Sequence, residues 1–262
     1  MIGNVSGDKN NLGIDWGEKL LNTVANNTIS HLFTESESIS VTVRCLPSSK
    51  ILQGSIDSFS MKGKGLVIRR QFRTEEMSFE TDAVSIDFSS VLKGKLQLRQ
   101  ATQAVAQVIL TQEDINEAFK AELVTKRLEN ITIPSLIELS GGIPVSFTDI
   151  WVELLQSNQV KILGKANLGN KIVPIGLIAT LSVEKRRKVR FQSPKFIPDN
   201  IPESIMKLSE IVTKIFVEIL DGMVDLDQFD LDGITLRINR LTTEEKKIIF
   251  SGYAQIEKIP NS

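Results

Sequence analysis

A long apolar segment near the end of the chain restricts the folds open to it. Residues 202–224 begin at Pro202, a residue suited to the first turn of a helix, and predict one helix about 30 Å long. Apolar positions cover most of its circumference, and the charged residues between Lys207 and Asp221 form only a narrow seam. A helix of this kind is wrapped by other elements rather than laid on a surface.

The segments available to wrap this helix have the pattern of strands. Residues 39–45 alternate apolar and polar side chains, which is the period of a half-buried strand. Three later segments are separated by turn-forming residues and predict an antiparallel meander: residues 145–155, 160–167 and 172–183. Near residues 82–83 the apolar positions change from odd-numbered to even-numbered residues, which predicts a bulge. Residues 234–259 predict a final hairpin.

Two further helices are predicted earlier in the chain. Asp15 is a plausible N-cap for a helix over about 15–33, and the capping-box pattern at 111–114 opens a helix over about 112–130. The sequence therefore predicts an α+β fold built from an antiparallel meander and helices.

Two segments of the chain share one pattern. Residues 56–68 and 226–238 align without a gap, which pairs Phe59 with Phe229 and Gly63 with Gly233. Either one strand–turn–strand element is used twice, or two generic segments have converged by chance. The first interpretation predicts that both phenylalanines face the apolar interior and that both glycines lie at bends.

Composition restricts the classes of partner. The chain has 262 residues with 31 basic and 32 acidic side chains, so no overall field attracts nucleic acid. The amino terminus lacks the pattern of a secretory signal, and no stretch reaches the length of a membrane span. We therefore expect a cytoplasmic or peripheral membrane protein that binds no nucleic acid.

Five segments carry a resemblance to a known family. They resemble the LmeA-like phospholipid-binding family of bacteria and lie at residues 53–59, 75–79, 111–116, 127–130 and 250–256. The likeness extends from about residue 14 to residue 259. It implies a single domain over 14–262, preceded by a flexible lead over 1–13.

The resemblance also implies a tubular lipid-binding fold, as in bactericidal permeability-increasing proteins. In that fold a long, strongly curved antiparallel sheet wraps around a helix and leaves an apolar groove for acyl chains. The groove residues predicted for this chain are Phe59, Ile205, Leu208, Ile211, Val212, Ile215, Phe216, Ile219, Leu220 and Phe229. A sealed, tightly packed core explains the same residues without any ligand.

A basic run lies where one strand turns into the next. Lys185, Arg186, Arg187 and Lys188 are adjacent, and each cation near an anionic bilayer contributes about 1 kcal/mol to binding. They are therefore predicted to contact headgroups or a membrane surface. The alternative is a solvated hairpin tip that protects a sheet edge from aggregation.

No reactive constellation is evident. His31 and Cys45 are the only residues of their types, so no Cys/His metal site or Ser/His catalytic set is predicted. The aspartates at 225, 227, 230 and 232 lack the ligand spacing of a calcium loop, and we expect a solvated strand face there. Neither a metal nor a cofactor is predicted, apart from a bound phospholipid or other acyl lipid.

The leading hypothesis is therefore non-enzymatic binding or transfer of phospholipid at or near a membrane surface. The alternative is a scaffold that uses the same fold to hold another protein. In that case Trp151 or the amino-terminal helix serves as the anchor.

Overall fold

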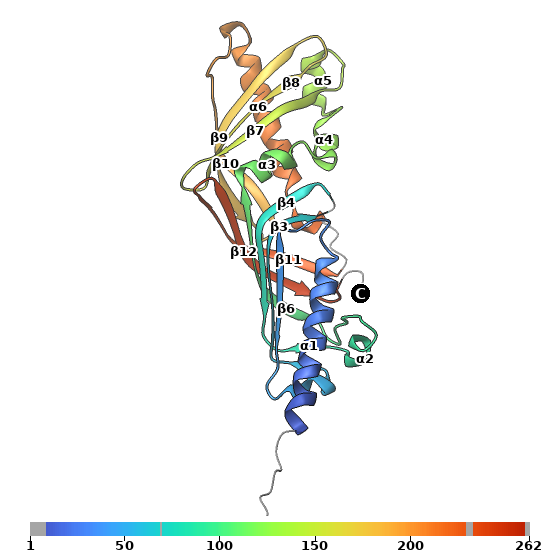
Figure 1. The fold of residues 1–262 in the computed structure, drawn as a ribbon. Coiled ribbons are helices and arrows are strands. Elements are labelled where there is room, and N and C mark those ends of the chain that lie inside the picture. The colour runs from blue at the N-terminus through green and yellow to red at the C-terminus, as the bar shows by residue number, and fades with distance from the viewer. Residues whose placement is uncertain (1–8, 69, 229–232, 260–262) are drawn as a thin grey trace, which may run out of the picture.

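The computed structural model describes residues 9–68, 70–228 and 233–259 of the chain. Figure 1 shows an elongated α+β molecule in which helices lie against antiparallel sheets. The helices in the described residues are α1 (Lys9–Ser30), α2 (Phe88–Val91), α3 (Gln112–Ala118), α4 (Glu122–Leu128), α5 (Pro134–Ser140) and α6 (Glu203–Met223). Two 3₁₀ turns add η1 (Ser48–Gln53) and η2 (Leu226–Gln228).

The strands form two main sheets and one small pair. The six-stranded sheet has the order β1 (Ser38–Arg44), β3 (Ser58–Ile68), β4 (Phe72–Thr81), β6 (Thr102–Thr111), β12 (Lys247–Ile256) and β11 (Ile234–Glu244). The four-stranded sheet has the order β10 (Lys188–Phe196), β9 (Ile172–Glu184), β8 (Gln159–Asn167) and β7 (Ser146–Leu154). The small pair is β2 (Ser55–Ile56) with β5 (Val84–Ser85).

The α+β class and the antiparallel pairing are confirmed, but the single long sheet is divided. The meander over 145–183 becomes β7, β8 and β9, and the helix over 202–224 becomes α6. Helices α3, α4 and α5 separate β6 from β7, and β11 and β12 return after α6 to pair beside β6. Apart from the β2–β5 pair, the strands up to β6 and the strands after α6 therefore belong to one sheet, and the strands between them, β7 to β10, form the other.

Two helices differ from their predicted bounds. α1 begins at Lys9, so residues 9–13 of the predicted flexible lead are helical, since no proline stops the helix there. The helix predicted over 112–130 is broken into α3 and α4. After the break, Ile115 and Phe119 on one side and Val124 and Leu128 on the other pack against the same core, while Leu123 is exposed.

The shared pattern of residues 56–68 and 226–238 does not give one repeated element. Gly63 lies within β3 opposite Met77, so the bend predicted there is wrong, and the left-handed glycine of this strand is Gly65. Gly233 has a φ of 91° just before β11, as a bend requires. Phe229 lies outside the described residues.

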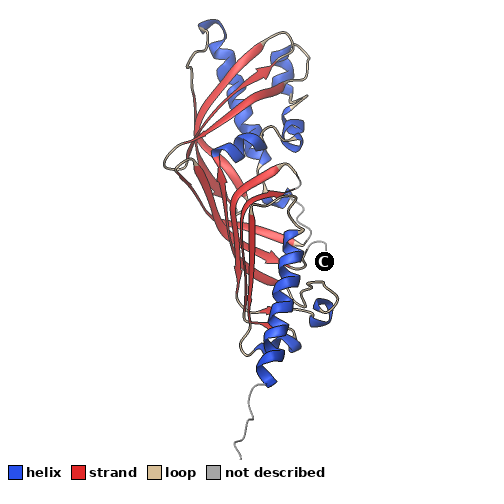
Figure 2. Cartoon of the chain, in the orientation of Figure 1, coloured by secondary structure: helices blue, strands red, loops and turns tan. Residues whose placement is uncertain are grey.

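Buried apolar side chains of the described residues form two hydrophobic cores, and Figure 2 shows the helices and sheets around them as two halves of the molecule. The α6 half consists of the four-stranded sheet with α3 to α6, and its core also includes Ile238, Leu241 and Ile248 from β11 and β12. The α1 half consists of the six-stranded sheet, the β2–β5 pair, η1, α1 and α2, with a core around Leu21 and Ala25. Strands β11 and β12 thus connect the two halves.

Candidate functional site

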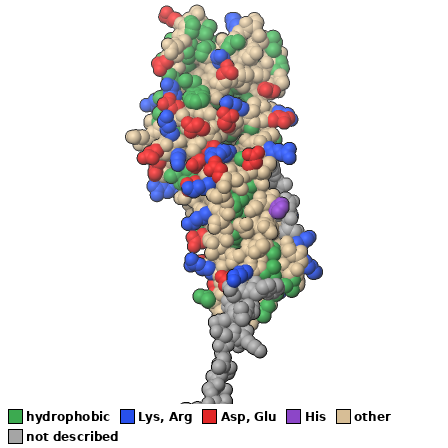
Figure 3. Space-filling model, in the orientation of Figure 1, with side chains coloured by type: hydrophobic (Ala, Val, Ile, Leu, Met, Phe, Trp, Pro, Cys, Tyr) green, Lys and Arg blue, Asp and Glu red, His purple; other side chains and the backbone are tan. Residues whose placement is uncertain are grey.

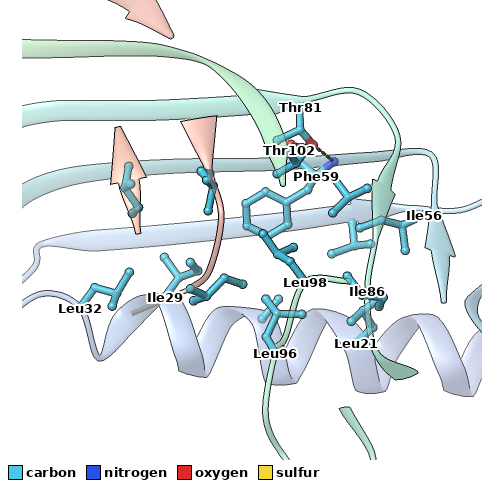
Figure 4. Close-up of a pocket in the computed structure, with 16 residues that line it drawn as sticks. Leu21, Ile29, Leu32, Ile56, Phe59, Thr81, Ile86, Leu96, Leu98 and Thr102 are labelled. Atoms are coloured by element: carbon cyan, nitrogen blue, oxygen red, sulfur yellow. Dashed lines mark hydrogen bonds between the residues drawn. The ribbon is translucent and has the colours of Figure 1, made fainter. Parts of the chain in front are cut away.

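An apolar pocket lies in the α1 half, between the six-stranded sheet and α1 (Figure 4). Its cavity has a volume of about 70 Å³ and is partly open to solvent. The lining residues are Leu21, Ala25, Ile29, Leu32, Val43, Ile56, Phe59, Thr81, Val84, Ile86, Leu96, Leu98, Thr102, Ile234, Ile256 and Ile259.

The sheet contributes one lining residue from each of its six strands. They are Val43, Phe59, Thr81, Thr102, Ile256 and Ile234, in the order of the strands across the sheet. Val43 lies opposite Phe59 in the β1–β3 register, and Thr102 lies opposite Ile256 in the β6–β12 register. Because strand partners share a face, the register of the sheet itself brings these side chains into one wall.

Small residues occupy the middle of this wall. Ala104 lies opposite Thr81 on one side and opposite Ala254 on the other, and the next inward pair is Ala106 with Gly252. Ala104 and Ala254 are almost fully buried. Other side chains cover these alanines, and none of the four small residues is among those that line the pocket.

Helix α1 forms the opposite wall. Leu21, Ala25, Ile29 and Leu32 lie on one stripe at helical spacing, as the sequence predicts. In Figure 4 the Phe59 ring points from the sheet toward this helix and lies beside Leu98. The side-chain oxygen of Asn22 accepts a hydrogen bond of 2.8 Å from the Val43 N–H, so the helix also satisfies a polar group of edge strand β1.

Among the described residues that line the pocket, none is charged. The polar ones are Thr81 and Thr102. The Thr81 hydroxyl is engaged, since it accepts a hydrogen bond of 3.2 Å from the Phe59 N–H and donates one of 2.9 Å to the Asp82 carbonyl. A polar ligand buried here would lose its hydrogen bonds to water without replacing them, which costs free energy. The transfer of a hydrocarbon chain from water into the pocket is favourable. The pocket therefore suits an acyl chain.

Of the predicted groove residues that the structure describes, Phe59 alone lines this pocket. Val212, Ile215, Phe216 and Leu220 are buried in the core of the α6 half, where the rings of Phe216 and Phe147 have centroids 4.7 Å apart. The other predicted groove residues on α6 are less buried. Ile211 is 38% exposed, and three are half-buried: Ile205, Leu208 and Ile219. The packing of α6 matches the sealed-core alternative, and lipid contact by these residues stays a prediction.

The basic run forms the turn between β9 and β10. Lys188 lies 3.1 Å and Arg187 3.6 Å from the Asp225 carboxylate, and Arg187 also pairs with Asp227. Arg186 lies 4.6 Å from the centre of the Tyr253 ring, so three of the four cations hold the turn against β11, β12 and the segment after α6. Lys185 is exposed. Headgroup contact by this run stays a prediction.

Asp225 is buried, which corrects the expectation of a solvated acidic face. Burial raises the pKa of its carboxyl, but the hydrogen bonds from Lys188 and from the Asp227 N–H, together with the Arg187 charge, outweigh burial and lower the pKa below 3.8. Asp227 pairs with Arg187 and Arg237, and residues 230 and 232 lie outside the described residues.

Residues considered for chemistry do not gather in the pocket. His31 follows α1 on the surface, with its Nδ1 2.5 Å from the Asn27 carbonyl oxygen. Cys45 is buried in the core around α1. Within the part of the chain that the structure describes, no three His, Cys, Asp or Glu side chains are placed to hold a metal ion.

The predicted groove missed the pocket residues of α1 and of the strands other than β3, and it also missed several in short connecting segments. Ile56, Val84, Ile86, Leu96 and Leu98 close the end of the pocket between β2, β5 and the loop around α2. An isolated bridge joins Ile86 to Leu98 across this loop. The apolar residues at every second position over 84–88 indicated a buried face in this segment. The sequence does not show that the loop folds back over the sheet.

A comparison with protein families assigns the chain. The model of the family described as LmeA-like phospholipid-binding matches residues 12–252, which is nearly the whole chain and includes most of the pocket. No curated protein matches it. None of the described helices is both long and apolar enough to cross a membrane. With its apolar, uncharged pocket between a curved sheet and a helix, the chain belongs to the LmeA-like phospholipid-binding family.

Proposed function

We propose that the protein binds phospholipid without catalysis, by taking an acyl chain into the pocket between α1 and the six-stranded sheet. The single observation behind this proposal is the lining, which is apolar except for two threonines and carries no charge. Family membership supports phospholipid as the ligand class. In this proposal the open six-stranded sheet around α1 is the tubular lipid-binding element.

The driving force is desolvation of the acyl chain. Each methylene transferred from water to the pocket contributes about 0.8 kcal/mol, so about five buried methylenes contribute roughly 4 kcal/mol before the cost of ordering the chain. The pocket offers no cation to a phosphate, so the headgroup stays at its mouth. Binding therefore depends on the length of the acyl chain more than on the type of headgroup. In this proposal the protein carries or transfers lipid at a membrane surface.

A filled pocket tests the proposal directly. Ala25→Phe places a phenyl ring from α1 into the space that the lipid needs, whereas Thr23→Phe adds the same ring on the exposed face of the helix. We expect lipid to co-purify with the wild-type protein and with Thr23→Phe, and at least tenfold less with Ala25→Phe. Native mass spectrometry after detergent-free purification measures the bound lipid.

A fluorescent fatty-acid analogue provides a second readout that does not depend on the expression host. Saturable binding to the wild-type protein with loss in Ala25→Phe supports the pocket. Equal binding by Ala25→Phe and Thr23→Phe, with both proteins folded by circular dichroism, contradicts it.

The scaffold function has its own observation in the α6 half. Trp151 of β7 is 52% exposed and lies opposite Leu163 of β8, which is 37% exposed. An apolar pair on the open face of a sheet is typical of a protein contact. Trp151→Ser removes this contact and leaves lipid binding unchanged, so loss of a co-purifying protein without loss of lipid supports the scaffold function.

A further inference from the structure

Three exposed leucines lie at the end of the α1 half that is far from α6. Leu46 follows β1, Leu52 belongs to η1 and Leu92 ends α2, and their side chains are 78%, 69% and 58% exposed. We call this end, formed by residues 44–57 and 82–99, the tip. Figure 3 shows hydrophobic side chains at the lower end of the molecule as well as at its upper end, while charges of both signs surround its middle.

The two loops of the tip form one surface. The Ile86 N–H donates to the Gly54 carbonyl at 2.7 Å, and Arg99 donates to the Gln53 carbonyl at 3.0 Å. Gly54 has a φ of 78°, and a Cβ at this position would lie 2.3 Å from the Ile86 oxygen. Glycine is therefore required where η1 meets the α2 loop.

The tip is continuous with the pocket. Ile56, Ile86 and Leu96 line the pocket and belong to the same two loops that carry the exposed leucines. Ile51 is fully buried in the core around α1, whereas the next residue, Leu52, faces solvent. Apolar side chains thus extend from the pocket wall through the loops to the surface.

The charge of the tip favours an anionic partner. It contains five basic and three acidic side chains. Asp57 is paired with Lys50 at 2.8 Å, and Asp87 lies 3.9 Å from Arg99. Lys93 and Lys95 are exposed directly after Leu92 and form no ion pair with any described residue. The third acid, Asp82, is exposed on the neighbouring turn.

We infer that the tip docks the protein on an anionic phospholipid bilayer, with Leu46, Leu52 and Leu92 in the interfacial layer and Lys93 and Lys95 on lipid phosphates. Exposed leucines beside unpaired lysines combine the two forces of interfacial binding, apolar burial and attraction to anionic lipid. Docking in this orientation points the tip end of the pocket at the bilayer. The inference rests on the proposed lipid binding and adds the surface through which lipid is exchanged.

Vesicle flotation tests the docking surface. Vesicles of equal parts phosphatidylcholine and phosphatidylglycerol are compared with vesicles of phosphatidylcholine alone. Each lysine contributes about fivefold to partitioning, so K93Q/K95Q lowers binding to the anionic vesicles about 25-fold. L52S/L92S lowers it at least tenfold. All four side chains are exposed, so folding is retained and is checked by circular dichroism.

Matched controls come from the α6 half. Ile172 is 65% exposed there, and its neighbour Lys171 is exposed too, so I172S and K171Q make the same kinds of chemical change far from the tip. We expect both controls to float like the wild-type protein. Full flotation of both tip variants, or loss of flotation in K171Q alone, overturns the inference. Wild-type protein that does not float on anionic vesicles but retains a bound protein through Leu52 and Leu92 also overturns it, because the tip then binds a protein.

The monomeric fatty-acid analogue separates this inference from the proposed function. We expect the tip variants to bind the analogue normally but not to float, and Ala25→Phe to float but not to bind the analogue. Flotation of the wild-type protein without binding of the analogue contradicts the pocket and supports the tip. Binding of the analogue without flotation supports the pocket and contradicts the tip.

Discussion

The two halves of the molecule use a long helix in opposite ways. In the α6 half, Val212, Phe216 and Leu220 are almost fully buried against the four-stranded sheet and its neighbours. In the α1 half, the stripe facing the sheet includes Ala25, and a cavity of about 70 Å³ remains beside it. One helix is sealed, and the other leaves space for a ligand.

This difference shows where a lipid site forms. A helix that is apolar on most of its circumference supplies enough side-chain volume to fill every gap around it, so its apolarity produces a closed core. A helix with one apolar stripe and a small residue in that stripe, such as Ala25, leaves part of its gap unfilled. A surplus of apolar residues in a sequence therefore indicates a core, whereas a small residue in a narrow apolar stripe indicates a cavity.

The largest expected effect distinguishes the two helices by stability. Phe216→Ala removes a fully buried ring from the α6 half and should lower the free energy of unfolding by about 3–5 kcal/mol. Ile29→Ala removes a half-buried side chain that already faces the pocket and should cost about 1 kcal/mol. Urea denaturation followed by circular dichroism measures both. Equal losses would mean that the α1 half is packed as tightly as the α6 half.

A second prediction concerns the ion pairs at the junction of the halves. Asp225→Asn removes the charge that Lys188 and Arg187 contact and should cost about 2 kcal/mol. The pKa of Asp225 is lower in the folded protein than in the unfolded chain. The stability that its charge contributes is therefore fully present above the unfolded-state pKa and is lost as the pH falls through the folded-state pKa. The wild-type protein should therefore lose stability more steeply than Asp225→Asn below pH 4. The free energy of unfolding of both proteins is measured between neutral pH and pH 3. Equal dependence on pH in the two proteins would contradict this prediction.

A smaller effect is expected at the tip. Asp87 caps α2, and hydrogen bonds from the hydroxyls of Ser90 and Ser89 lower its pKa to about 2. Asp87→Ala should cost about 1 kcal/mol and raise hydrogen exchange in residues 88–95, with no change in α6. Removal of the cap also loosens the loop that carries Leu92. Exchange that rises equally in both halves would mean that the tip does not move independently of the α6 half.

The smallest effect concerns Cys45, which reports on the α1 core. Its side chain is 1% exposed, and burial together with the Asp57 charge raises the pKa of its thiol. We expect slow labelling by a thiol reagent at neutral pH in the folded protein. Because the α1 half is less well filled, labelling should proceed faster than global unfolding. Labelling at the global unfolding rate would place both halves in one cooperative unit.

The sequence predicts the elements better than the site. Local patterns such as Pro202, the turns of the meander and the capping box at Thr111 depend on neighbouring residues, and the structure confirms α6, β7 to β9 and the start of α3. The pocket depends on the β6–β12 register, which places Thr102 opposite Ile256, and on the loop that returns Leu96 and Leu98 to α1. These contacts join residues far apart in the chain. For this reason Phe59 was found, but the walls around it were not.

The central claim is that an acyl chain lies beside α1 and not beside α6. Photo-crosslinking with a phospholipid that carries a diazirine near the end of one acyl chain, followed by peptide mass spectrometry, tests it most directly. The account predicts crosslinks to peptides containing Ile29, Phe59 and Leu98 and their loss in Ala25→Phe. Crosslinks concentrated on α6, at Ile211 and Ile219, would contradict it.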